Sequence, residues 1–256
     1  MKLFMENFKG VSVLFVLLLG LASCQDENEP VPTENQEHVQ LQSTARSENG
    51  TDPQERTVVG AFIVSDFEVG TKDVQMKYAA QADLAAGIGL GDITLKSNVN
   101  TSLGTSAATP KSLVLVSNGD AQIEVVGEGD TPEGKYTEVE LSLYKNTEVE
   151  EDHHMYNKSL LVRGEVQGTP TWVWLDVEKQ LRAEAEGSDG FDVEEETELL
   201  VVFDMVELFN GVNFELAADG NADGRIDISP DNEDGNMELY SQIESNIDTA
   251  VKFERR

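Results

Sequence analysis

The chain is poor in cysteine, in cations and in long apolar runs. Its 256 residues include one cysteine and three histidines, and 18 lysines and arginines stand against 49 acidic residues, for a net charge of −31. A surface this negative repels nucleic acid and anionic lipid, which argues against a nucleic-acid partner. There is no Gly-x-Ser-x-Gly motif, no nucleotide-binding glycine loop and no convincing pair of catalytic carboxylates. We therefore expect a protein that is not an enzyme.

The N-terminus combines a short apolar stretch with the single cysteine. Lys2 and Lys9 precede an apolar run at residues 11–21. This run is too short to cross a bilayer comfortably as a helix. A Leu-Ala-Ser-Cys sequence follows and ends at Cys24. This order resembles the lipobox of bacterial lipoproteins, which implies a signal peptide at 1–23, a covalent lipid on Cys24 and attachment to a membrane through that lipid. The alternative is an ordinary secretory signal beside an accidental cysteine.

Residues 24–56 predict an acidic, disordered tether. The segment after Cys24 is polar, contains three prolines and offers little to bury, so it cannot offset its ordering entropy. Residues 25–29 (QDENE) resemble the acidic signal by which lipoproteins of some Gram-negative bacteria reach the exterior of the outer membrane. That resemblance implies a protein that faces the cell exterior. If the segment is only an acidic linker, the protein could instead lie on the periplasmic face of the outer membrane. Lipidation would also leave no thiol for disulfides, catalysis or zinc.

Residues 57–256 predict a mainly β domain, an antiparallel β-sandwich with a C-terminal amphipathic helix. Short β-branched and aromatic runs alternate with Gly, Asn, Asp and Pro turns, which is typical of a sandwich. Two subdomains that meet near 146–158 are an alternative. Strand-like runs occupy 58–69, 74–79, 93–95, 113–116, 123–126, 136–144, 160–166, 171–177, 181–185 and 199–203.

The C-terminal segment has helical rather than strand periodicity. One face at helical spacing carries the apolar residues Met237, Leu239, Tyr240, Ile243, Ile247 and Val251. The sequence predicts a helix over 237–252, with an asparagine at 236 as its cap and basic residues near its end.

A partial calcium-binding pattern precedes that helix. Residues 219–227 read DGNADGRID, which resembles the first three-quarters of an EF-hand loop. The resemblance implies oxygen ligands from Asp219, Asn221, Asp223, the Arg225 carbonyl and Asp227, and calcium as a structural ion. Pro230 stands at the closing position and Asp231 comes one residue late, so the loop is incomplete. A second cluster at 231–236 could complete the site or hold another ion, and both clusters also suit tight turns.

Two tryptophans form a second candidate site. Trp172 and Trp174 share one face of a strand. If exposed, they could stack on a sugar ring as in a glycan-binding module; if buried, they belong to the core. The adjacent His153 and His154 would point to opposite faces of a strand, and the acids before them favour an exposed loop over a metal site.

The general plan resembles uncharacterised β-sandwich lipoprotein families of Gram-negative bacteria, on the segments 134–139 (GKYTEV) and 199–203 (LLVVF). That resemblance implies a non-enzymatic surface lipoprotein with a binding or structural role, toward an extracellular glycan or protein ligand. A pilin- or adhesin-like subunit is a further alternative. In it, a protease would trim the tether at Arg46 or Arg56, and an edge strand would accept a strand from a partner.

Overall fold

Two β-sheets make up most of the chain that the computed structural model describes. The described residues are 36–50, 57–83, 94–102, 109–132, 134–185, 190–193 and 198–256. The predicted signal peptide, Cys24, the acidic cluster at 25–29 and Arg56 lie outside them. Within this part of the chain, no helix is both long and apolar enough to span a membrane.

The larger sheet has eleven strands, and its main path runs β11-β8-β3-β9-β10-β14. Strand β3 merges two of the predicted runs into one long strand, which also pairs with β2, β4 and β5. The strands of this sheet are β2 (Val58–Val59), β3 (Phe62–Asp83), β4 (Thr94–Ser102), β5 (Lys111–Ser117), β6 (Asp120–Ala121), β8 (Gly134–Leu143), β9 (Leu160–Val166), β10 (Thr169–Leu175), β11 (Gln180–Glu184), β12 (Phe191–Val193) and β14 (Ile226–Ile228).

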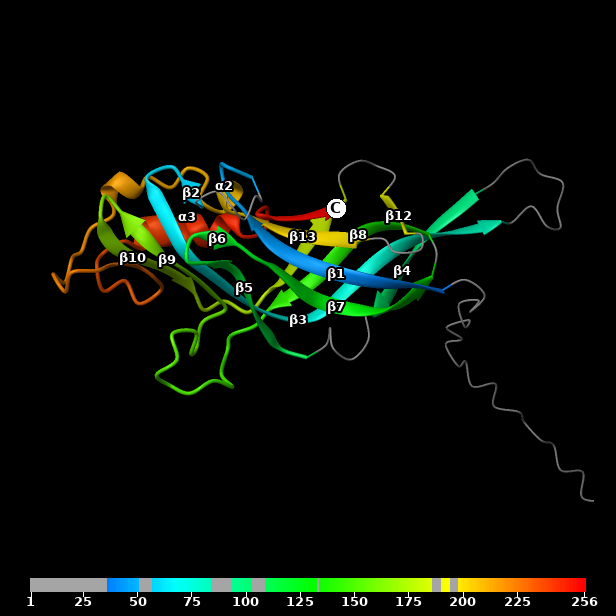
Figure 1. The fold of residues 1–256 in the computed structure, drawn as a ribbon, viewed down its shortest axis with the longest axis horizontal. Coiled ribbons are helices and arrows are strands. Elements are labelled where there is room, and N and C mark those ends of the chain that lie inside the picture. Colours follow the sequence, from blue (N-terminus) through cyan, green and yellow to red (C-terminus); the bar gives the residue numbers. More distant parts are fainter. Residues whose placement is uncertain are drawn as a thin grey trace, which may run out of the picture. The chain divides into compact units, whose positions relative to one another are not determined.

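The smaller sheet has the order β15-β13-β1-β7, with strands β15 (Val251–Arg255), β13 (Glu198–Asp204), β1 (Gln36–Arg46) and β7 (Ile123–Pro132). Its strand β1 lies between β13 and β7 (Figure 1), inside the segment predicted to be a disordered tether. The boundary expected at residue 57 is therefore wrong. Val39, Leu41 and Ala45 are buried, and pairing on both sides supports a strand whose composition is largely polar.

The prediction of a mainly β fold is confirmed, but the pairing is not purely antiparallel. Strand β1 runs parallel to β13, and β10 runs parallel to β14, whereas the other ladders between described strands are antiparallel. Strands from both sides of residues 146–158 also pair directly, as β3 does with β9. That segment therefore does not separate two sheets.

Both sheets contribute to one hydrophobic core. The rings of Phe67 in β3 and Phe203 in β13 meet edge to face with centroids 6.0 Å apart. Phe191 in β12 and Phe253 in β15 meet in the same way at 5.2 Å. Aromatic side chains from each sheet therefore pack directly against the other sheet.

The C-terminal helix is shorter than predicted. Helix α3 spans Met237–Asn246, and the next residues turn before β15 begins. Within β15, Val251 and Phe253 are buried while Lys252 and Glu254 are not, which is strand periodicity. Asn236 makes no capping bond with its side chain; its amide instead donates to the carbonyls of Ala218 and Asp227. The other helical segments of the described residues are the short α2 (Met205–Leu208) and a 3-10 turn at Phe214–Leu216.

Candidate functional site

The two tryptophans lie on the outer face of the larger sheet. Thr171, Val173 and Leu175 of β10 are fully buried, so the alternating residues Trp172 and Trp174 point away from the core. Both rings are half-buried. The interpretation of these tryptophans as core residues is therefore wrong, and they form part of a surface.

The pairing of β10 with its neighbouring strands brings other predicted site residues to the same face. Trp172 lies opposite Arg163 of β9 and is in register with Asp227 of β14. Arg163 in turn lies opposite Asp66 of β3. Residues directly opposite in a ladder project from the same side of the sheet, so one row of side chains crosses four strands. We call Trp172, Trp174, Arg163, Lys158 and Arg225 the tryptophan face.

Cations lie over both indole rings of the tryptophan face. The guanidinium carbon of Arg225 is 4.6 Å from the centroid of the Trp172 ring, and that of Arg163 is 5.9 Å away. The Lys158 Nζ lies 5.0 Å from the Trp174 ring. Such contacts contribute about 0.5–2 kcal/mol each and orient the rings. Neither Arg163 nor Lys158 was predicted, because a single cation in a strand or loop has no signature of its own.

Carboxylates pair with these cations. Arg225 donates from Nε to both Asp227 oxygens at 2.9 and 3.1 Å and from Nη2 at 2.6 Å, and these hydrogen bonds raise the pKa of Arg225 above its usual value. The Arg163 Nη2 lies 3.4 Å from Asp66 and 3.8 Å from Glu68. Its Nε–H is buried and finds no acceptor among the described residues. The face thus contains arginine–carboxylate pairs rather than free positive charge.

The charge of Lys158 is less favoured than that of an exposed lysine. Burial lowers its pKa, and the nearby Arg225 acts in the same direction, whereas Asp231 and Asp227 oppose the shift. Asp231, predicted as a late calcium ligand, therefore acts electrostatically on the tryptophan face.

The predicted calcium loop folds as a series of side-chain-capped turns. Asp219 accepts from the backbone N–H groups of Asp223 at 3.1 Å and Gly224 at 2.8 Å. Asn221 accepts from Asp223 at 2.9 Å, and Asp223 accepts from Arg225 at 2.9 Å. These are the bonds by which Asp and Asn stabilise turns.

A residue that the pattern did not single out connects this loop to the rest of the fold. Asp234 is buried and accepts from the backbone N–H of Asn221 at 3.1 Å and of Asp227 at 2.6 Å. It belongs to the second acidic cluster, which was predicted to complete the calcium site, to hold another ion or to form a tight turn.

The calcium ligand set is only partly brought together. The Asp227 carboxylate accepts from Arg225, whereas the carboxylates of Asp219 and Asp223 accept from backbone N–H groups of the loop. Among the described residues, no group of three or more His, Cys, Asp or Glu side chains is arranged to hold a metal ion. His153 and His154 stack at 4.3 Å, and the His154 ring contacts Glu68 at 2.5 Å.

Comparison with protein-family models, curated proteins and solved structures finds no match to this chain. Functional inference therefore depends on the site itself.

Proposed function

We propose that this chain is a non-enzymatic lipoprotein of the outer membrane, displayed toward the cell exterior, which binds an extracellular glycan at the tryptophan face. The observation that carries the binding role is the outward position of both Trp172 and Trp174, beside arginine–carboxylate pairs. In this proposal the two sheets form a β-sandwich that supports the site. The lipobox-like segment before Cys24 supports the anchor, and the acidic cluster supports the location.

Physical reasons favour a glycan over other ligands. Two half-buried tryptophans lie on one outer face, where part of each indole ring is open to a ligand. Ligand sites combine apolar or aromatic surface with a few well-placed polar groups. Here the indole rings give the apolar surface, while the Arg163 and Arg225 pairs present N–H donors beside carboxylate acceptors. Sugars have apolar C–H faces and hydroxyl edges that match this combination.

A glycan array tests the binding role. The mature chain and a Trp172→Ala/Trp174→Ala variant would be applied to the same array, with Leu216→Ala as control. Leu216 is 70% exposed and lies outside the tryptophan face, so its loss removes apolar surface elsewhere. Binding that the double variant loses and the control retains supports the proposal. Equal binding by all three proteins would refute the tryptophan face as the binding site. No binding by any of them would refute a glycan as the ligand.

The lipid anchor has an independent test. Radiolabelled palmitate should label the wild-type protein in a Gram-negative host and fail to label Cys24→Ala. Surface proteolysis of intact cells then distinguishes the exterior face, where the domain is degraded, from the periplasmic face, where it is protected.

Calcium stays part of the proposal as a structural ion of the loop at 219–227, supported by the D-x-N-x-D-G order of its residues. In this proposal its oxygens come from Asp219, Asn221, Asp223 and the Arg225 carbonyl. An ion there would stabilise the loop from which Arg225 reaches Trp172.

A pilin-like subunit is the second candidate, favoured by the position of β1. Cleavage after Arg46 would cut the chain directly after a strand that lies between β13 and β7. Loss of β1 would expose the edges of both neighbours, which another subunit's strand could occupy. N-terminal sequencing of the surface protein tests this: a chain that begins at Ser47 supports it, and a chain that still begins at lipidated Cys24 refutes it.

A further inference from the structure

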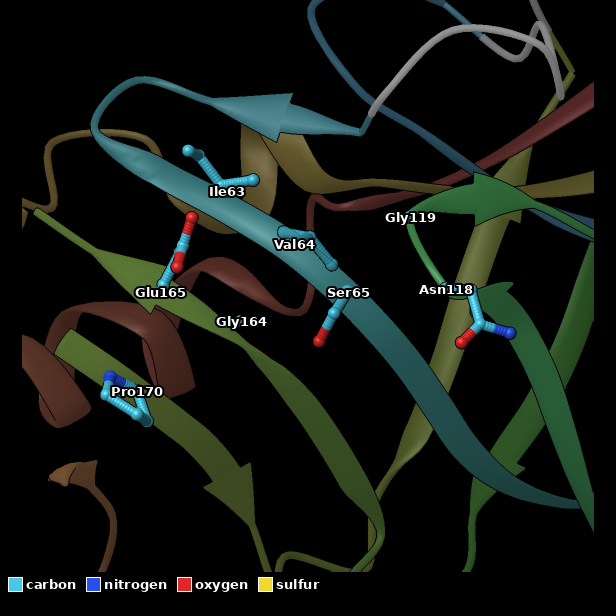
Figure 2. Close-up of a pocket in the computed structure, with 8 residues that line it drawn as sticks. All are labelled: Ile63, Val64, Ser65, Asn118, Gly119, Gly164, Glu165 and Pro170. Carbon is cyan, nitrogen blue, oxygen red and sulfur yellow. The ribbon is translucent and has the colours of Figure 1, made fainter. Parts of the chain in front are cut away.

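A shallow pocket of about 220 Å³ opens between β3, β9 and β10 and the turn that joins β5 to β6. Figure 2 shows Ser65 and Asn118 on one side of Gly164, and Glu165 and Pro170 on the other. Ile63 also lines it. Sites for drug-sized ligands usually measure about 300–1,000 Å³, so this pocket suits a smaller unit.

The pocket adjoins the tryptophan face. Pro170, Glu165 and Ile63 lie opposite one another across β10, β9 and β3. This row is two residues along each of β10 and β9 from Trp172 and Arg163. Side chains two residues apart share a face and lie about 7 Å apart along a strand. One oligosaccharide can therefore contact the pocket and Trp172 at the same time.

Backbone geometry forms the pocket. The β3–β9 register shifts between Val64 and Asp66, so β3 bulges at Ser65. The Gly119 N–H donates to the Ser65 carbonyl at 2.8 Å and holds the β5–β6 turn against the bulge. A Cβ on Gly164 would lie 2.1 Å from the Ile63 carbonyl oxygen, so only glycine permits this approach of β9 to β3. A pocket held by backbone is preorganised, which lowers the cost of binding.

The pocket lining selects for a neutral polar ligand. Among the described residues that line it, the polar side chains are one carboxylate, one amide and one hydroxyl, from Glu165, Asn118 and Ser65, and none is a lysine, arginine or histidine. With a net charge of −31 on the chain, an anionic unit would be repelled. Ile63 and Pro170 supply apolar contact for C–H groups.

We propose that this pocket is a subsite for one neutral sugar residue of a glycan whose neighbouring residue contacts Trp172. The inference rests on the proposed glycan-binding function and adds the ligand class and the contacts. Glu165 accepts hydrogen bonds from sugar hydroxyls, Asn118 donates and accepts, and Ile63 and Pro170 contact the apolar face of the ring.

Tryptophan fluorescence measures this binding directly, because Trp172 and Trp174 are the two tryptophans of the chain. The mature chain would be titrated with cellobiose, maltose, mannobiose and xylobiose, and with digalacturonate as the anionic comparison. The pocket variants are Glu165→Gln and Asn118→Gly. Glycine suits position 118, where φ is +53°. The control is Glu128→Gln, an exposed acid on β7 of the smaller sheet.

We expect a saturable emission change with a neutral disaccharide. Glu165→Gln replaces a charge-assisted hydrogen bond with a weaker neutral one, and Asn118→Gly removes its hydrogen bond, so binding should weaken about tenfold in each pocket variant and stay unchanged in the control. Binding that needs the tryptophans but is as strong in both pocket variants as in the wild type overturns the subsite and leaves the proposed function standing. Stronger binding of digalacturonate overturns the neutral class, and a negative titration together with a negative glycan array overturns both proposals.

Discussion

Replacing Arg225 by methionine tests how the tryptophan face is held together. The Asp227 side chain is 6% exposed and forms two short bonds and one longer one to Arg225, whose own side chain is 38% exposed. Removing one partner of a buried ion pair costs about 3–5 kcal/mol. Solvent around Arg225 screens this pair, so we expect Arg225→Met to lower the free energy of unfolding by about 2–3 kcal/mol.

Replacing the other partner, in Asp227→Asn, should lower the free energy of unfolding by less than Arg225→Met does. In Asp227→Asn the arginine left behind reaches water, whereas in Arg225→Met the carboxylate left behind does not. We expect the double variant to be more stable than the sum of the two single losses predicts, because the pair acts as a unit. Urea unfolding followed by tryptophan fluorescence measures all four proteins. A loss below about 0.5 kcal/mol in Arg225→Met, the range of ordinary surface substitutions, would refute this account of the pair. Recovery of that variant in saturating calcium would show that Asp227 has a metal as its partner.

Three further predictions concern the loop, the larger sheet and β1. Calcium should raise the melting temperature of the wild type but not of Asp223→Ala, measured by thermal unfolding with calcium and with chelator; equal behaviour would reduce residues 219–227 to turn residues. Hydrogen bonds from Lys77 lower the pKa of Glu140 from its ordinary value of 4.5 despite burial, so its contribution is present above pH 4.5 and is lost as pH falls through the lower folded pKa. Glu140→Gln should therefore destabilise the protein at pH 7 and differ little from wild type near pH 2, as urea unfolding at each pH would show, whereas a constant difference would contradict this. Leu41→Ala should cost about 2–5 kcal/mol if β1 is a core strand, while His38→Ala, exposed on the same strand, should cost under about 0.5 kcal/mol; equal small losses would contradict the strand.

Local periodicity predicted much of the fold. Runs such as 160–166 and 171–177 became β9 and β10 because β-branched and aromatic residues alternate there between turns. The shared face of Trp172 and Trp174 followed from the same alternation. Whether that face is turned to the core or to solvent depends on which elements pack against the sheet. This is a tertiary property that the sequence of the strand does not encode.

The errors arose where long-range pairing outweighs composition. Strand β1 is rich in Gln, Ser and Thr and resembled linker, yet β7 and β13 supply its hydrogen-bond partners. Val251 fitted a helical stripe, but its neighbour β13 imposes strand geometry on it. The contact of Arg225 with Trp172 likewise depends on β14 lying beside β10.

The placement of β1 has a consequence for the order of folding. The Ser43 hydroxyl donates to the Val201 carbonyl across 158 positions of sequence, and β13 pairs next with β15 at the C-terminal end. Closing so large a loop costs chain entropy before any contact compensates for it, and such topologies fold slowly. The smaller sheet cannot close until nearly the whole polypeptide is available. Strand β1, although it comes first among the described strands, is therefore among the last to become fixed.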